Sequence, residues 1–209
     1  MSRRGSYAKG VLKREQILTT ALSVFATAGY RGTSLRTVAE LCDLSLAGLM
    51  HYFESKDHLF VEILRRRDAI GLDILAASPA RHGLDHVLRS NSSQPGLIEL
   101  YATMAAAAGD PRHPAAEYFR ERYAFLIEHA VQIQLPGYDE DTIDPEVLRL
   151  ERARARLAFA VVDGLQTQWL LDRDLDILGL YRDYLRFSRR PLADDIDADD
   201  TRDTTADRA

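Results

Sequence analysis

The stretch that decides the fold is residues 33–60, TSLRTVAELCDLSLAGLMHYFESKDHLF. Thr33 and Ser34 stand immediately before an apolar run at helical spacing, where a hydroxyl can accept hydrogen bonds from the unpaired N–H groups of a first turn. The pattern predicts a short helix that ends near Cys42, a tight connection, and a second short helix over residues 46–53. Two short helices joined in this way form a helix-turn-helix, the motif that reads the major groove in many DNA-binding proteins.

In the second of these helices, Leu49 and Phe53 lie four residues apart and are expected to face the core. The opposite face carries small, polar and aromatic residues that suit contacts with base edges. The residues expected at or near base edges are Ser45, Leu46, Ala47, Gly48, His51 and Tyr52. Arg36 and Lys56 are expected to contact phosphate, with a solvated lysine as the alternative for Lys56.

The same stretch resembles the DNA-binding end of the TetR family of bacterial transcriptional regulators. The residues that carry the resemblance are Gly29-Tyr30-Arg31-Gly32-Thr33-Ser34, Val38-Ala39, Leu49, His51-Tyr52-Phe53, Ser55-Lys56-Asp57 and Leu59-Phe60. The resemblance implies a sequence-specific transcriptional regulator, namely a repressor that binds a palindromic operator in double-stranded DNA as a homodimer and is released by a small-molecule effector. It weakens after residue 60, although residues 112–119 and 163–172 resemble an actinobacterial subset of the family.

Three positions depart from the family pattern. Asp43 stands where the family usually has Gly in the turn, Met50 where it usually has Tyr, and Gly48 where Thr or Asn is more usual. A residue other than Gly at position 43 must adopt an unusual backbone conformation, and Asp is among the side chains that tolerate one. Because these changes affect the expected DNA contacts, a helical protein-interaction module that has lost DNA binding remains the alternative function.

The formal net charge of −5 is unevenly divided along the chain. Residues 1–67 hold eleven Lys/Arg against six Asp/Glu, a net of +5, whereas residues 68–209 carry a net of −10. Because phosphate attracts the first part and repels the second, the N-terminal end is expected to face DNA. Within it, residues 1–10 are either a frayed terminus or a basic arm that lies along DNA.

Hydrophobic periodicity along the whole chain predicts an all-α protein of about nine helices. The expected helices cover residues 11–28, 35–42, 46–53, 56–77, 82–88, 95–108, 115–135, 145–171 and 174–188, with a polar linker at 90–94. They divide into an N-terminal three-helix helix-turn-helix DNA-binding domain (1–55) and a C-terminal helical effector-binding and dimerisation domain (56–188). Residues 189–209, with seven Asp, are expected to form a disordered acidic tail.

A ligand site is expected within the C-terminal domain. Its candidate lining residues are Tyr101, Met104, Tyr118, Phe119, Tyr123, Phe159, Asp163, Gln166 and Trp169, although aromatic residues and Met are also what an ordinary core contains. Asp163 and Gln166 are the informative members, because polar groups amid apolar helix turns need partners. Arg122 or a ligand would supply one for Asp163.

The helix expected over residues 145–171 is apolar on two sides in its second half, so it needs packing partners on both. One side can pack within the subunit. The other, together with the final helix, is expected to meet a second copy in a four-helix interface about a two-fold axis. The expected interface residues are Leu157, Val161, Leu165, Leu178, Tyr181 and Leu185.

Other classes of function lack support in the sequence. We find no nucleophile with a paired base, no phosphate-binding glycine loop and no metal motif, so neither an enzyme nor a cofactor is expected. His82 and His86 have metal-ligand spacing but no further ligand nearby. The single cysteine, Cys42, is expected in the core, with a redox sensor as the alternative. The chain lacks a run of eighteen apolar residues and its start is unlike a secretory signal, so a cytoplasmic protein without a membrane partner is expected.

Overall fold

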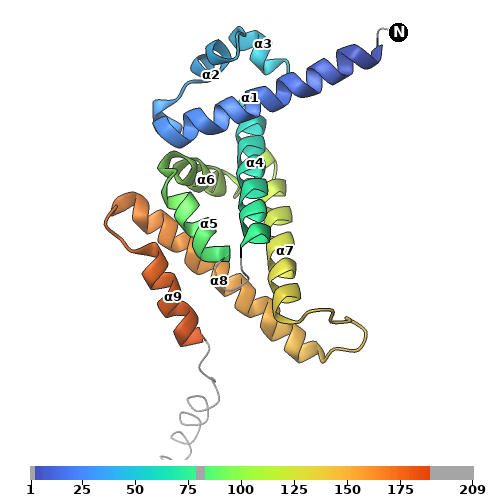
Figure 1. The fold of residues 1–209 in the computed structure, drawn as a ribbon, viewed down its shortest axis with the longest axis vertical. Helices are drawn as coiled ribbons and strands as arrows, with labels where there is room; N and C mark the ends of the chain where they lie inside the picture. The colour runs from blue at the N-terminus through green and yellow to red at the C-terminus, as the bar shows by residue number, and fades with distance from the viewer. Residues whose placement is uncertain (1–2, 79–82, 189–209) are drawn as a thin grey trace, which may run out of the picture.

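The computed structural model describes residues 3–78 and 83–188, and this part of the chain consists of helices without strands (Figure 1). The all-α prediction is therefore confirmed. The helices are α1 (Arg3–Gly32), α2 (Leu35–Leu41), α3 (Leu46–Met50), α4 (Lys56–Ala77), α5 (Gly83–Ser92), α6 (Pro95–Ala107), α7 (Pro114–Gln134), α8 (Pro145–Leu171) and α9 (Ile177–Ser188).

The first three helices form a head at one end of the molecule, and α4 runs from this head down into the body (Figure 1). Hydroxyl groups begin three of the helices, as expected from sequence. The Oγ of Ser34 accepts from the N–H of Thr37 at 3.1 Å, and Ser45 and Ser55 make the equivalent bonds at the starts of α3 and α4. Asp43, in the turn between α2 and α3, has a φ of 55°, the unusual conformation expected there.

Several boundaries differ from the predicted ones. α1 begins at Arg3 rather than at residue 11. Residues 3–10 include two glycines, but they contain no proline to stop a helix, and Arg, Ala and Lys among them favour one. α3 ends at Met50 rather than at residue 53, and the chain turns so that Phe53 is buried. α5 continues to Ser92, so the predicted linker over 90–94 is mostly helical. The expected acidic tail and His82 lie outside the described residues.

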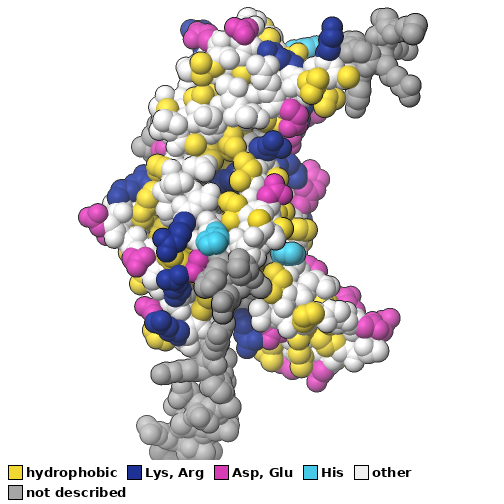
Figure 2. Space-filling model, in the orientation of Figure 1, with side chains coloured by type: hydrophobic (Ala, Val, Ile, Leu, Met, Phe, Trp, Pro, Cys, Tyr) yellow, Lys and Arg dark blue, Asp and Glu magenta, His cyan; other side chains and the backbone are white. Residues whose placement is uncertain are grey.

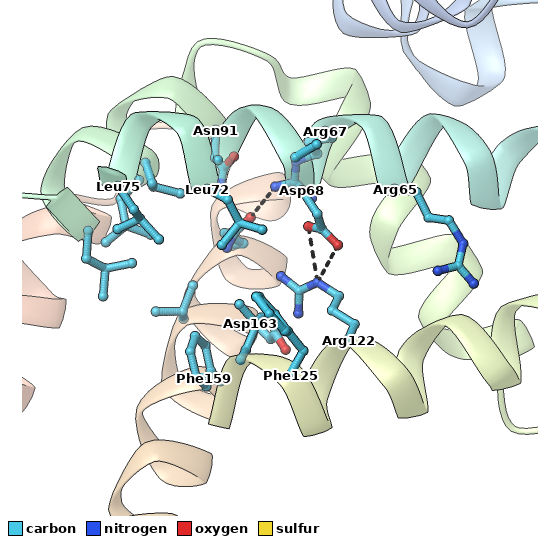
Figure 3. Close-up of a pocket in the computed structure, with 18 of the residues that line it drawn as sticks. Arg65, Arg67, Asp68, Leu72, Leu75, Asn91, Arg122, Phe125, Phe159 and Asp163 are labelled. Carbon is cyan, nitrogen blue, oxygen red and sulfur yellow. Dashed lines mark hydrogen bonds and ion pairs between the residues drawn. The ribbon is translucent and has the colours of Figure 1, made fainter. Parts of the chain in front are cut away.

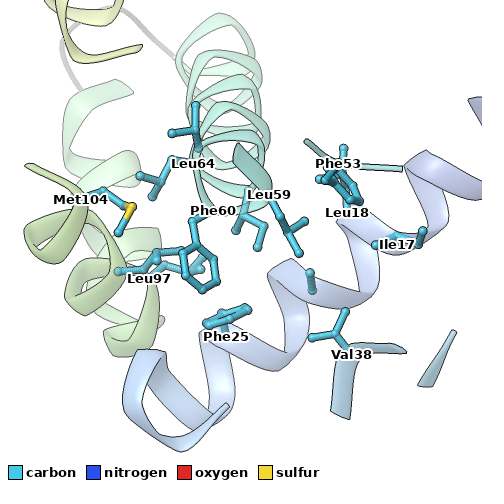
Figure 4. Close-up of a cluster of buried hydrophobic side chains, with 14 of the residues drawn as sticks. Ile17, Leu18, Phe25, Val38, Phe53, Leu59, Phe60, Leu64, Leu97 and Met104 are labelled. Carbon is cyan, nitrogen blue, oxygen red and sulfur yellow. The ribbon is translucent and has the colours of Figure 1, made fainter. Parts of the chain in front are cut away.

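One hydrophobic cluster continues from the head into the body (Figure 4). Phe25 of α1 meets Phe60 of α4 edge-to-face, with ring centroids 5.3 Å apart. Val38 and Leu49 bring α2 and α3 to the same cluster, and both are fully buried. Its body side is supplied by α6 and α7, with Leu97, Leu100, Tyr101, Met104, Tyr118 and Phe119. The core therefore crosses the expected domain boundary at residue 55, and the division into domains stays a prediction.

The start of α6 lies very close to the backbone of α1. A Cβ built on Gly96 would lie 1.9 Å from the carbonyl oxygen of Phe25 and 2.5 Å from the Cα of Gly29. Gly29 has a φ of 75°, which ends the regular part of α1 there. The next residue, Tyr30, donates its N–H to Oε2 of Glu99 at 3.2 Å. The absence of a side chain at position 96 thus lets α6 contact the α1 backbone directly.

A second hydrophobic cluster, made of Leu88, Val162, Leu165, Ile177 and Tyr181, joins α5, α8 and α9. It places α9 against α8 and α5, at the side of the body away from α7 (Figure 1). Among the helices described, none combines the length and the apolar character needed to cross a membrane.

We expect Gly96→Ala to lower the free energy of unfolding by about 1–3 kcal/mol, because α6 must move away from α1 to admit the methyl group. Urea unfolding followed by circular dichroism measures the change. Gly10→Ala is the matched control: it is also a helical glycine, it has no atom within 4 Å of the added Cβ, and it should be neutral or stabilising. Equal unfolding midpoints for the two variants would contradict this close approach.

Candidate functional site

The outer face of the helix-turn-helix is open to solvent. Ser45, Leu46, Ala47 and His51 are exposed, Gly48 and Tyr52 are partly buried, and Leu49 lies beneath them in the core. The separation of an outer and an inner face on α3 is therefore the one predicted from spacing. Short polar groups, a histidine and a tyrosine suit readout of base edges in a groove.

Arg36 and Lys56 both lie exposed on the head. Lys56 is the first residue of α4, where a cation opposes the helix dipole. Its Nζ lies 5.2 Å from the ring centroid of Phe60 and 5.8 Å from that of Tyr30, and these rings favour the cation at that place. These contacts place the Lys56 ammonium at the start of α4, and its contact with phosphate stays a prediction.

A contact that we did not predict from sequence fastens the motif to α1. The Nζ of Lys13 donates to the carbonyl oxygen of Cys42 at 2.6 Å, at the end of α2. A cation at a helix C-terminus is favourable. A search of the sequence for lysines that could contact the end of α2 would have been the way to predict this bond. Cys42 itself is fully buried, as expected for a small core residue.

A group of acidic residues lies at the end of the body far from the head. Acidic side chains gather around the α7–α8 connection, at the lower right of the body in Figure 2. Asp139, Glu140, Asp141 and Asp144 belong to that connection. The head also carries exposed acidic residues, Glu40, Asp43 and Glu54, so its positive charge is a net excess of Lys and Arg.

The body contains a cavity of about 340 Å³ between α4, α5, α7 and α8 (Figure 3). One end is charged and the other is apolar. Its lining consists of Arg65, Arg67, Asp68, Ala69, Gly71, Leu72, Leu75, Leu84, Val87, Leu88, Asn91, Tyr118, Glu121, Arg122, Phe125, Leu126, Phe159, Val162, Asp163 and Gln166.

Four predicted ligand residues line this cavity: Tyr118, Phe159, Asp163 and Gln166. Two more, Tyr101 and Tyr123, lie behind the wall and donate their hydroxyls to Oδ2 of Asp163. Met104 and Phe119 belong to the first hydrophobic cluster. Trp169 lies elsewhere, beneath the guanidinium of Arg173 at 4.1 Å and beside α9. The predicted set is therefore only partly brought together.

Asp163 finds its partners in the two tyrosines rather than in Arg122. Arg122 instead donates through Nε to Asp68 at 3.1 Å, and the Tyr118 hydroxyl donates to the same carboxylate at 2.6 Å. A second nitrogen of Arg122 donates to the Tyr101 hydroxyl at 3.2 Å. This network satisfies the carboxylates at the charged end of the cavity.

Burial and hydrogen bonding shift the pKa values of this network. Burial raises the pKa of the Tyr101 and Tyr118 hydroxyls, with the nearby carboxylates adding to the increase. Burial, followed by the hydrogen bond to Asp163, raises the pKa of Tyr123 to about 12. Burial opposes the charge of Arg122, but Asp68 and the surrounding hydroxyls outweigh it and its pKa is raised.

The three consecutive arginines of α4 have different surroundings. Arg65 pairs with Glu121 at 2.8 Å, and Arg66 pairs with Glu15 at 3.7 Å. Arg67 reaches into the cavity and donates to Oε1 of Gln166 at 3.1 Å. The missed signal was helical spacing, because Arg67, Gly71 and Leu75 are each four residues apart and share the inner face of α4.

The residues expected at a subunit interface fall into two groups. Leu157 is 60% exposed, as an unpaired interface residue should be. Leu165 and Tyr181 are buried by their own chain in the second cluster, and Val161, Leu178 and Leu185 are partly buried against it. Apolar residues that the sequence analysis did not place at an interface are also exposed on α8 and α9: Val147, Leu150, Leu171, Leu180 and Phe187.

No metal-ligating group of three or more side chains occurs in residues 3–78 and 83–188. His86, one of the two histidines with metal-ligand spacing, shares a hydrogen bond of 2.8 Å with the Ser78 hydroxyl.

Comparisons with known proteins converge on the head. Residues 17–63 match the family described as "Bacterial regulatory proteins, tetR family". The HTH-type transcriptional regulator RutR of Escherichia coli (strain K12) is 41% identical over 54 residues, which are 26% of each chain. The HTH-type transcriptional repressor KstR of Rhodococcus jostii is 39% identical over 109 residues, 46% of this chain and 51% of KstR. The chain thus spans between a quarter and half of the length of these curated relatives.

The fold extends further than the sequence similarity. The crystal structure of a transcriptional regulator from Rhodococcus sp. Rha1 aligns with a TM-score of 0.58 and 21% identity. The alignment covers 84% of this chain and 96% of that one, so the fold of head and body together is shared.

The Tyr123 hydroxyl provides a test of the network through pH. Its pKa is about 12 in the folded chain against about 10 in the unfolded one, so its contribution to stability is complete below pH ~10 and is lost as the pH rises through ~12. Tyr123→Phe cannot ionise there, so its free energy of unfolding should fall less steeply over that range than that of the wild type. Urea unfolding at a series of alkaline pH values measures both slopes, and identical slopes would contradict the assignment.

Proposed function

We propose that this chain, whose helix-turn-helix region belongs to the TetR family of bacterial regulators, is a sequence-specific DNA-binding transcriptional repressor. It binds a palindromic operator as a homodimer and is released by a small molecule. The observation that carries the proposal is the open outer face of α3 on a cationic head, in a region that matches the family. Because bacterial DNA lies in the cytoplasm, a repressor of this kind would act there.

The expected DNA contacts divide by chemistry. Arg36 and Lys56 bind phosphate and set the position of the head. Ser45, His51 and Tyr52 supply hydrogen-bonding groups at base edges, with Leu46, Ala47 and Gly48 allowing close approach. Asp43 holds the left-handed conformation that the turn requires, so the motif forms without the usual glycine. This weakens the reason for the alternative, a protein-interaction module without DNA binding.

A dimer is supported by an apolar stripe on α8. Leu150, Leu157, Gly164 and Leu171 are spaced seven residues apart, and the three leucines are exposed. A Cβ added at Gly164 would meet nothing within 4 Å, so the middle of the stripe is open for close approach by another helix. Leu180 and Phe187 extend exposed apolar surface onto α9. Two copies joined here would present two heads to successive major grooves, ~34 Å apart.

Release by a ligand is supported by the course of α4. Its first residues belong to the head, and Arg65, Arg67, Asp68, Leu72 and Leu75 line the cavity. A ligand that favours a different position of α4 would change the spacing of the heads. Coupling of ~1–3 kcal/mol, about 5- to 150-fold in operator affinity, is typical of such regulation.

Binding to the DNA that flanks the protein's own gene tests the DNA contacts. We expect Arg36→Ala and Lys56→Ala each to weaken binding and to reduce the slope of log affinity against log salt by about 1, because each removes one phosphate contact. Fluorescence anisotropy across a salt series measures both quantities. Arg149→Ala, a change at an arginine 63% exposed near the start of α8 and far from the head, is the control and should leave the slope unchanged (Figure 1). Wild-type binding that is insensitive to salt and to Lys56→Ala would count against the proposal.

The dimer has its own test. Leu157→Glu should convert the dimer to a monomer, because a carboxylate would be buried in the middle of the apolar stripe. Sedimentation velocity measures the mass. Leu41→Glu, at a leucine 58% exposed on the head, is the matched control and should remain dimeric. A wild-type protein that sediments as a monomer at micromolar concentration would exclude this interface.

A further inference from the structure

The six charged side chains of the cavity wall are not all neutralised in the same way. Arg65 pairs with Glu121, and Arg122 pairs with Asp68. Asp163 accepts two tyrosine hydroxyls. Arg67 remains, and among the described residues no carboxylate forms an ion pair with it: its hydrogen-bond partner is the neutral amide of Gln166.

The surroundings of Arg67 are those of a receptor for a small anion. Its guanidinium lies 5.4 Å from the ring centroid of Tyr101, and the guanidinium of Arg122 lies 5.0 Å from the same ring. The hydrogen bond to Gln166, which is 5% exposed, fixes one side of the guanidinium. Within the part of the chain that the structure describes, its other N–H groups make no hydrogen bond, and the planar fork matches a carboxylate in two-point geometry.

Burying the charged guanidinium of Arg67 without an anion beside it is unfavourable in free energy. Burial lowers the pKa of Arg67, which shows that its environment disfavours the charged form despite the nearby Asp68. A guanidinium remains charged in proteins, so it cannot relieve the cost by losing its proton. A bound anion would offset it.

The cavity continues from Arg67 into an apolar arm. Leu72 and Leu75 follow along α4, and Phe159 lies across from them on α8 (Figure 3). Leu84 and Val87 of α5 also line the cavity. Leu75 follows Arg67 by eight positions, which corresponds to about 12 Å along the helix. A ligand that fills the cavity therefore has one polar end and an apolar chain or ring of about that length.

We propose that the cavity binds an amphipathic monocarboxylate, with its carboxylate on the guanidinium of Arg67 and its apolar part between Leu72, Leu75 and Phe159. The inference rests on the proposed function, because it names the chemical class of the effector. A single negative charge fits best, since only one guanidinium lacks an ion pair and Asp68 and Asp163 flank the position. A cationic ligand would have to compete with the two tyrosine hydroxyls for Asp163.

Calorimetric titration of the full-length protein with octanoate, octan-1-ol and octylamine tests the charge requirement. These probes share one carbon chain and differ in the charge of the head group. We expect octanoate to bind at least tenfold more tightly than the alcohol and the amine. Shortening the acid should weaken binding about three- to fourfold for each methylene removed, since the chain lies in an apolar arm.

Two arginine variants test the position of the carboxylate. Arg67→Gln should weaken octanoate binding at least tenfold. Arg66→Gln is the matched control, because Arg66 is the neighbouring arginine on α4, does not line the cavity and pairs with Glu15 of α1. This variant should bind octanoate within twofold of wild type. Circular dichroism checks that both variants fold. If Arg67→Gln does not fold, the comparison of octanoate, octan-1-ol and octylamine on the wild-type protein still tests whether the cavity prefers an anion.

Three results would overturn the inference: no octanoate binding, octylamine binding equal to or tighter than octanoate, or unchanged octanoate affinity in folded Arg67→Gln. Operator binding by the ligand-free protein is measured separately and does not depend on these outcomes. Octanoate that binds through Arg67 but leaves operator affinity unchanged would support the site and count against ligand release. Operator binding without any affinity for octanoate would support the regulator and overturn the ligand class.

Discussion

The packing of Phe25 against Phe60 is the interaction on which the arrangement of the molecule depends. It joins the long first helix to the one helix that enters both the head and the cavity wall. Because Val38 and Leu49 pack into the same cluster, the helix-turn-helix rests on a core that also includes α6 and α7. Two short helices cannot bury enough apolar surface alone, and here the body supplies what they lack. The orientation of the head is therefore a property of the body as well.

The charged end of the cavity shows how a helical body can hold several ionisable groups at once. Two carboxylates are satisfied by three tyrosine hydroxyls and one guanidinium, which form a connected network across α4, α6, α7 and α8. A fully bonded network of this kind is rigid, because each member fixes the orientation of the next. It provides a firm surface against which Arg67 and the apolar arm are positioned.

Much of the fold could be predicted from sequence because it depends on local signals. The bounds of α4 and α8 follow from Ser55, Pro145 and continuous apolar periodicity, and both were predicted to the residue. The end of α3 was not predicted correctly, because the burial of Phe53 depends on contact with α1, which is distant in sequence. The same limit applies to the sites. Periodicity identified Asp163 and Gln166 as unusual, but it could not show that Trp169 turns toward α9 or that Leu165 is covered by Tyr181 and its neighbours.

The length of α4 has a mechanical consequence. The eleven residue steps from Lys56 to Arg67 correspond to roughly 16 Å of uninterrupted helix, which would act as a lever arm between cavity and head. A tilt of about 10° around the cavity would carry the start of the helix through about 3 Å over that distance. In a two-fold dimer the two α4 helices would tilt in opposite directions. Such a small tilt would therefore change the distance between the two heads, which would no longer match the spacing of successive major grooves.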